Sequence, residues 1–188
     1  TPFYSPITKQ WHMVIRPYCP DRRVAVTSSP DLKNWTDVYT MMQPDCLDPP
    51  GTQFYGLRVW PYGVTNGCGT PDDFDGYFVG CLHIFRSSLS EREGPGKWTG
   101  SLHDELAYST NGLFWNRTHR RSLFPEFEHG DPGAGWFDYF IIGYDDEQRL
   151  RLAVRKWTVS HMLKPPIPDY TGGPNGWQHH TLRKDGFV

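Results

Sequence analysis

One pattern occurs twice in this chain at a fixed spacing, and it constrains the fold more than any other feature. Each copy is a short apolar strand followed by Ser-x-(Asp/Asn)-x-x-x-Trp, first within residues 24–35 and again within residues 106–115. The second serine and the second tryptophan each follow their counterparts by 80 positions. Ser, Asp and Asn side chains bond nearby backbone groups and so form turns, and Asn and Gly tolerate positive φ. The spacing predicts a repeated supersecondary unit.

The rest of the chain is typical of short strands joined by turns. Aromatic residues make up 15% of it, and it contains 19 Gly and 17 Pro, while runs that favour helices are scarce. Residues 39–50 and 87–100 are expected to be loops, and residues 116–121 a basic, exposed segment. Residues 3–8 are expected to be a strand end and turn, and strands are expected at residues 11–18, 23–27, 54–62, 77–85, 106–109, 137–144, 150–157 and 177–182.

Many short strands without helical periodicity indicate an all-β sandwich, barrel or propeller. The 80-residue repeat favours a single β-propeller domain over residues 1–188, with about three blades represented. Because propellers typically need about four to eight blades, a longer chain or another subunit is expected to supply the remainder. The start at Thr1 and the end at Val188 fit part of a longer protein.

Composition also restricts partners and cofactors. A net charge of −2 provides no basic surface for nucleic acid. No apolar run approaches the roughly 20 residues of a membrane span, and no signal peptide is present, although a mature secreted protein would lack one too. The four cysteines have no Cys-x-x-Cys spacing, so zinc is not expected, whereas disulfides and buried thiols both remain open. Two N-glycosylation sequons, at residues 34–36 and 116–118, fit an extracellular protein but also arise by chance.

Several of these segments resemble a known family. Residues 3–11, 29–36, 48–56 and 106–112 resemble parts of the five-bladed propeller proteins related to glycoside hydrolase families 32 and 43, and above all a branch labelled sugar-hydrolase-like. Residues 181–188 resemble the segment that leaves the propeller in that branch. The resemblance implies a glycoside hydrolase that acts on or binds carbohydrate. The invertase motifs Trp-Met-Asn-Asp-Pro-Asn-Gly, Arg-Asp-Pro and Glu-Cys are absent, so catalytic residues cannot be transferred by motif.

Glycosidic cleavage needs two carboxyl groups, about 5–5.5 Å apart for retention and about 6.5–9.5 Å apart for inversion. Asp104 is the first candidate, because it is expected at the entry to an inner strand, where alternation sends Glu105 to the opposite face. Asp138, expected at another strand start, and Asp48, before a Pro-Pro corner, are the others. Each also has a structural interpretation, as a strand-end or turn residue.

Sugar recognition needs aromatic faces and groups that bond hydroxyls. The candidates for substrate binding are Tyr55, Arg58 and Trp136, although packing explains Tyr55 equally well. His83 alternates with apolar residues and is expected to be a core histidine. Residues 73–75 offer too few ligands for calcium, and residues 179–180 are expected to be an exposed histidine pair. No metal or cofactor is therefore predicted.

Three functional hypotheses remain open from the sequence. The first is a glycoside hydrolase that uses carboxylate acid/base chemistry. The second is a non-catalytic propeller that binds glycan or protein, which the missing catalytic motifs favour. The third is a structural subunit that uses the propeller as a scaffold, which a fold alone does not exclude.

Overall fold

A computed structural model describes residues 2–17, 22–64, 74–87, 100–117, 119–120, 137–147, 149–156 and 176–183. Within these ranges the regular structure consists of β-strands, and no residue is helical. The expected all-β class is confirmed. No described segment forms a helix long and apolar enough to cross a membrane.

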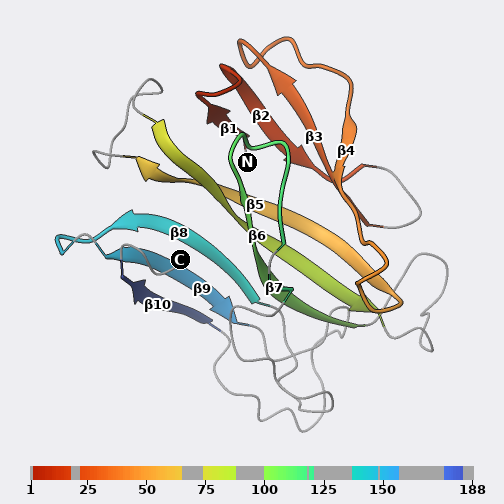
Figure 1. The fold of residues 1–188 in the computed structure, drawn as a ribbon. Coiled ribbons are helices and arrows are strands. Elements are labelled where there is room, and N and C mark those ends of the chain that lie inside the picture. Colours follow the sequence, from red (N-terminus) through yellow and green to blue (C-terminus); the bar gives the residue numbers. More distant parts are fainter. Residues whose placement is uncertain are drawn as a thin grey trace, which may run out of the picture. The chain divides into compact units, whose positions relative to one another are not determined.

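The described residues contain ten strands in three sheets, and in each sheet neighbouring strands are also consecutive in sequence (Figure 1). The first sheet has the order β1-β2-β3-β4, the second β5-β6-β7, and the third β10-β9-β8. The strand pairings of the first and third sheets are antiparallel. The strands are β1 (Pro2–Ser5), β2 (Gln10–Ile15), β3 (Val24–Ser29), β4 (Tyr39–Met42), β5 (Thr52–Val64), β6 (Phe74–Ser87), β7 (Gly100–Ser109), β8 (Phe137–Tyr144), β9 (Leu150–Lys156) and β10 (Gly176–Leu182).

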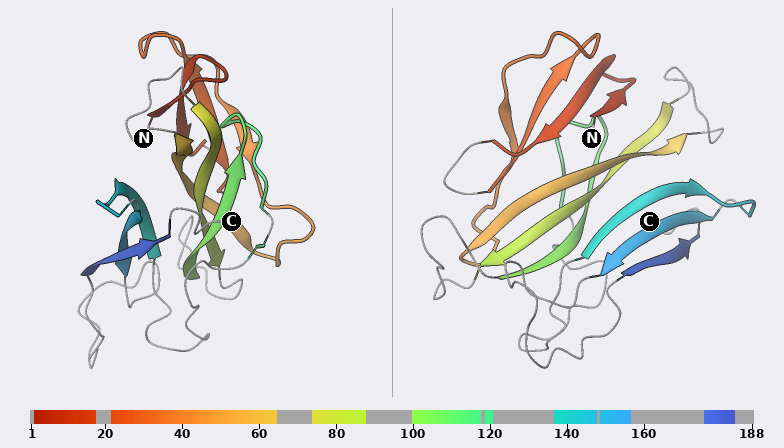
Figure 2. Two further views of the ribbon diagram at one scale, coloured as in Figure 1. Left: turned by 60° about the vertical axis from the view of Figure 1, so that its left-hand side comes forward. Right: turned by 180° about the vertical axis from the view of Figure 1, so that it is seen from behind.

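The chain divides into two compact units. Unit 1 comprises residues 1–49, 53–84 and 105–121, and unit 2 comprises residues 50–52, 85–104 and 122–188. Unit 1 holds the first sheet and most of the second, whereas the third sheet belongs to unit 2. Figure 2 shows that the strands twist along their length, as sheets of L-residues do.

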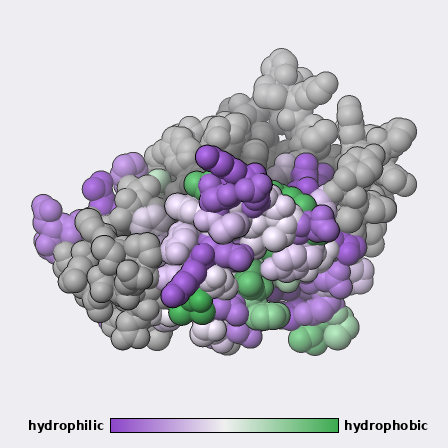
Figure 3. Space-filling view, turned by 90° about the horizontal axis from the view of Figure 1, so that it is seen from above, coloured by the Kyte–Doolittle hydropathy of each residue, from purple (hydrophilic) through white to green (hydrophobic). Residues whose placement is uncertain are grey.

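The core of unit 1 is apolar and is contributed by both of its sheets. Val24 and Met42 come from the first sheet, and Phe54, Leu82 and Ala107 from the second. Full burial of a side chain as large as valine, leucine, methionine or phenylalanine stabilises a fold by roughly 1.5–3 kcal/mol. On the face drawn in Figure 3, hydrophobic side chains form small areas separated by hydrophilic ones.

The first copy of the repeated pattern forms a turn held by its own side chains. Ser29 Oγ donates to Asp31 Oδ1 at 3.1 Å, and Asp31 Oδ1 accepts the backbone N–H groups of Lys33 (2.9 Å) and Asn34 (2.8 Å). Trp35 Nε1 donates to a backbone carbonyl three residues earlier, at 3.3 Å. These three N–H groups would otherwise need water as their partner, so the side chains stabilise the turn.

The second copy repeats these bonds one by one. Ser109 Oγ donates to Asn111 Oδ1 at 3.2 Å, and Asn111 Oδ1 accepts the N–H groups of Leu113 and Phe114, both at 2.9 Å. Trp115 Nε1 donates to the carbonyl three residues earlier, at 3.0 Å. The predicted repeat is therefore confirmed at the level of individual hydrogen bonds.

One position of the turn needs a left-handed backbone. Gly112 fills it in the second copy with φ 82°, and Leu32 fills it in the first copy with φ 62°. Glycine adopts this region without cost, whereas for other L-residues it costs about 1–2 kcal/mol. The Asn-Gly pair was expected to supply positive φ, and the structure assigns it to the glycine.

The second tryptophan packs into unit 1 over a glycine. A Cβ added to Gly80 would lie 2.6 Å from Trp115 Cζ3 and 2.8 Å from Leu57 Cδ1. Any side chain at Gly80 would therefore displace the indole. Trp115 joins the apolar core as a partly buried residue, in line with an architectural role.

Three of the sequence-based expectations that bear on the site differ from the structure. The segment expected to be a loop at residues 39–50 begins with β4, a short edge strand that pairs with β3 across a bulge. The strand expected at residues 106–109 begins instead at Gly100, so Asp104 lies inside β7 rather than at its entry. The segment expected to be exposed at residues 116–121 contains Arg117, whose side chain is only 5% exposed.

Replacing Asn111 with Ala should lower the free energy of unfolding by about 1–2 kcal/mol, because two backbone N–H groups lose their acceptor. Asn111→Asp should keep most of the stability at pH 7, because aspartate makes the same bonds in the first copy. Urea unfolding followed by tryptophan fluorescence measures both. Equal losses in the two variants would contradict the assigned role of the side-chain oxygen.

Candidate functional site

Asp48 lies in a tight turn that precedes β5. Asp48 N–H donates to the Asp45 carbonyl at 3.0 Å, and Asp45 N–H donates back to Asp48 Oδ2 at 2.9 Å. Asp45 Oδ1 also accepts the N–H of Leu47 at 2.9 Å. Asp residues favour such turns because their carboxylates replace backbone acceptors. The turn fixes the direction of the Asp48 carboxylate.

Arg117 binds this carboxylate and a second one. Its Nη1 and Nη2 donate to the two oxygens of Asp48 at 2.8 and 2.7 Å, and its Nε and Nη2 donate to Glu105 Oε2 at 3.0 and 2.7 Å. The guanidinium carbon lies 4.7 Å from the Phe54 ring centroid. The side chains of Arg117, Asp48 and Glu105 are 5%, 5% and 3% exposed. A bidentate, buried ion pair of this kind has high geometric specificity.

This arrangement keeps Asp48 ionised. Burial alone would raise the pKa of Asp48, but the hydrogen bonds from Arg117 and from the Asp45 N–H, together with the positive charges of Arg117 and Arg120, outweigh it, and the pKa lies below its ordinary value. Burial also acts to lower the pKa of Arg117, yet its bonds to Asp48 and Glu105 raise it. A carboxylate held in its charged form cannot supply the proton of a general acid. The structure therefore gives Asp48 a bonding partner that the sequence did not indicate.

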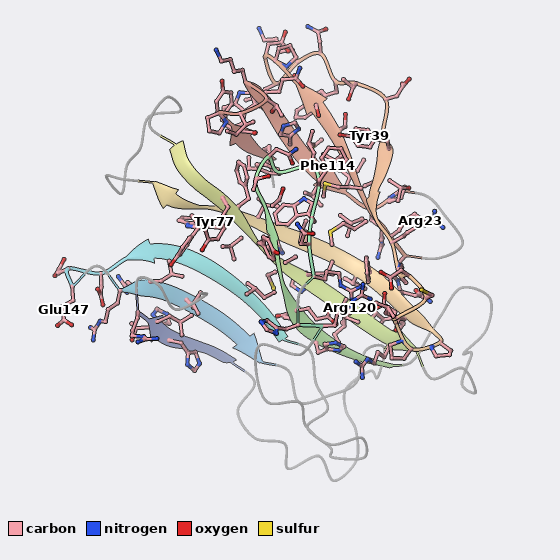
Figure 4. The ribbon with its side chains drawn as sticks, viewed as in Figure 1. Arg23, Tyr39, Tyr77, Phe114, Arg120 and Glu147 are labelled. Carbon is pink, nitrogen blue, oxygen red and sulfur yellow. The ribbon has the colours of Figure 1, made fainter. Side chains whose placement is uncertain are left out.

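A second, more exposed pair extends the cluster. Arg120, which is labelled in Figure 4, donates to both oxygens of Asp45, at 2.8 and 2.6 Å. Arg120 also lies 3.5 Å from Asp48 Oδ1. Its hydrogen bond to Asp45 lowers the pKa of that carboxyl to about 2. Side-chain exposures of 26% and 47% for this pair indicate a small contribution to stability.

The other predicted carboxylates occupy strands of unit 2. Asp104 is fully buried in β7. Asp138 is the second residue of β8, which confirms the expected strand start, and its backbone pairs with Arg155 of β9. Trp136 lies outside the described residues. The catalytic roles of Asp104, Asp138 and Asp48 stay predictions.

Tyr55 and Arg58 lie on β5 and are both half-buried. Two arginines contact the Tyr55 ring: the guanidinium carbon of Arg16 lies 5.3 Å and that of Arg22 lies 5.2 Å from its centroid. These distances are within the range of cation–π attraction. No local sequence pattern indicates this grouping, because the three residues come from separate segments.

A buried histidine was also not singled out from the sequence. His12 Nε2 and Thr8 Oγ1 are 2.6 Å apart, and His12 Nδ1 and Ser28 Oγ are 2.8 Å apart. Ser28 is only 6% exposed, and the group that orients the imidazole is a hydroxyl rather than a carboxylate. A nucleophilic serine needs access to substrate and an oriented base, so this chain of bonds is structural.

Some buried residues have side chains of the types that bind metal ions. Cys81, His83 and Asp104 are buried and have such side chains. Cys81 and His83 belong to unit 1 and Asp104 to unit 2. Zinc sites use three or four protein ligands, so this set does not make a full site within either unit. His83 is buried as expected, and the absence of a metal stays a prediction.

Two cysteines can be assigned a state. Cys46 is exposed and Cys81 is buried, and both are thiols rather than disulfides. Cys19 and Cys68 lie outside the described residues.

Comparison with protein-family models, with curated proteins and with solved structures found no match.

Replacing Arg117 with Met should lower the free energy of unfolding by about 3–5 kcal/mol, because it leaves two buried carboxylates without their cation. Chemical denaturation at pH 7 measures the loss. Arg120→Met, in the exposed pair, should cost no more than about 1 kcal/mol. The triple variant Arg117→Met, Asp48→Asn, Glu105→Gln should recover part of the loss, and a triple variant no more stable than Arg117→Met would contradict this account.

His12 should make stability depend on pH in a defined direction. Burial lowers the pKa of His12 below its ordinary value of 6.5, so the unfolded chain binds the proton more readily. Its contribution is fully present above pH 6.5 and is lost as pH falls through the lowered pKa. Urea midpoints between pH 8 and 5 should therefore fall more steeply in the wild type than in His12→Gln. The control variant His119→Gln, at an exposed position, should show the same dependence of the urea midpoint on pH as the wild type. If His12→Gln also shows the wild-type dependence, His12 is not its source.

Proposed function

We propose that this chain is part of a β-propeller protein that binds and hydrolyses carbohydrate, related to the five-bladed glycoside hydrolase-like proteins. The observation that carries the proposal is the order of strands: each of the three sheets is built from consecutive strands. That is the topology of a propeller blade, and propeller blades are typically four-stranded. The first sheet has four strands, and the turn after β3 recurs after β7 with the same bonds.

In this proposal the carboxylates of Asp104 and Asp138 provide acid/base or nucleophilic chemistry. Both residues lie on strands rather than on loops, and rigid elements hold catalytic groups better than loops do. Asp48 has a structural role in this proposal. Because its two oxygens bind Arg117, it stabilises the segment that leads into β5, where Tyr55 and Arg58 lie.

The engagement of Asp48 also supports a second candidate function, a non-catalytic propeller that binds glycan. One of three predicted carboxylates is committed to an ion pair, which leaves fewer groups for chemistry. A binding module would need the aromatic and guanidinium groups near β5 but no competent carboxyl pair. The two functions predict different results with the same variants.

Hydrolysis of fructosides, arabinosides and mannosides should be compared for the wild type, Asp104→Asn and Asp138→Asn. The enzyme proposal expects turnover by the wild type and a loss of about 10²–10⁴-fold in each variant, because removal of a general acid or base has that effect. Asp146→Asn, in the exposed turn between β8 and β9, is the matched control and should keep full activity.

Binding should be measured on the same proteins by calorimetry. A wild type that binds one of these glycans without turnover supports the non-catalytic function and overturns the enzyme. Turnover that is unchanged in both Asp104→Asn and Asp138→Asn removes those residues as catalysts. Neither binding nor turnover with any of the glycans counts against both functions.

A further inference from the structure

The groups around Tyr55 form a positively charged cluster from three separate parts of unit 1. Arg16 follows β2, Arg22 precedes β3, and Tyr55 lies near the start of β5. The backbone N–H of Phe54 donates to the Arg22 carbonyl at 2.9 Å, which fixes the start of β5 beside the start of β3. Arg23, labelled in Figure 4, marks that start of β3. The cluster is thus positioned by backbone structure.

The residues of the cluster differ in their exposure to solvent. Arg22 is half-buried, and its Nη1 donates to Gln53 Oε1 at 3.4 Å, at the long end of a hydrogen bond. Tyr55 is half-buried, and Arg16 is exposed. Arg16 is therefore the accessible cation of the cluster, whereas Arg22 and Tyr55 are partly covered.

The pKa of Arg22 shifts in the opposite direction to the pKa values of Arg117, Arg120 and Arg149. Burial lowers the pKa of Arg22, and the positive charge of Arg16 lowers it further, against an opposing effect of Tyr55. The pKa values of Arg117, Arg120 and Arg149 are raised instead, by hydrogen bonds to carboxylates. Arg22 is therefore in surroundings that disfavour its charge. An anion placed between Arg16 and Arg22 would reverse that effect.

We propose that Arg16, Arg22 and Tyr55 bind the anionic group of a carbohydrate, a carboxylate or a sulfate. The inference rests on the proposed carbohydrate function and adds the class of sugar. A guanidinium presents paired N–H donors that match the oxygens of a carboxylate or sulfate. The phenol of Tyr55 adds a hydroxyl that can bond a sugar hydroxyl, and its ring holds both guanidinium groups by cation–π contact.

The test uses the full chain and two matched ligand pairs. Tri-galacturonate is compared with its methyl ester, which has the same sugars without the charge, and galactose 6-sulfate is compared with galactose. Calorimetry at 50 and 300 mM salt should show at least tenfold tighter binding of one anionic member over its neutral partner. The preference should shrink at high salt, because exposed charges are screened. Tighter binding of tri-galacturonate would identify the ligand group as a carboxylate, and tighter binding of galactose 6-sulfate would identify it as a sulfate.

Variants then locate the binding. Arg16→Gln removes an exposed charge without opening the core and should lose about tenfold in affinity for the anionic ligand. Arg16→Lys should recover part of that loss, because it keeps the charge but not the paired donors. Arg151→Gln, an exposed arginine on β9, is the matched control and should bind as the wild type does.

The outcomes separate this inference from the proposed function. Equal binding of the charged and neutral members, or an unchanged affinity in Arg16→Gln, overturns the anion site. If neutral fructans, arabinans or mannans bind while every anionic ligand fails, the carbohydrate function stands and the anion site falls. If no glycan of either kind binds, both are overturned.

Discussion

Unit 1 depends on a single buried guanidinium. Arg117 joins the turn at Asp48, the strand β7 at Glu105 and the ring of Phe54 in the core. Removing charges from water costs several kcal/mol for each ion, and the gain is comparable only when geometry and hydrogen bonds are good. Here each carboxylate receives two bonds from Arg117. An arrangement of the strands that separated these charges would leave them buried without a partner and would therefore be much less stable.

The same unit contains two arginine environments with opposite consequences. Arg117 is surrounded by carboxylates, so its charge is satisfied and its role is architectural. Arg22 shares a tyrosine ring with Arg16, and its charge is disfavoured first by burial and then by the positive charge of Arg16. In the proposed anion site, recognition would therefore use other cations than the one that stabilises unit 1. This division also explains why Asp48, although it lies beside β5, is a poor donor of protons.

The features that could be predicted from sequence are those whose bonds are local. The turn at Ser29 uses acceptors two and three residues away, so its pattern is visible in the sequence and recurs at Ser109. The Arg117 cluster joins residues 69 positions apart, and no local pattern reveals it. Asp104 was expected at a strand entry because the apolar run of this strand begins at Leu106, yet β7 begins at Gly100 within the sheet of β5, β6 and β7.

The difference between local and distant bonds also sets an order of events during synthesis. The first turn can close as soon as its residues have been made, because loops of about ten residues close within roughly 10–100 ns. Asp48 must wait for Arg117, 69 residues later, and chains grow at roughly 5–20 residues per second. For several seconds the nascent chain therefore carries Asp48 as a hydrated, unburied carboxylate. Unit 1 is completed only when its cation leaves the ribosome.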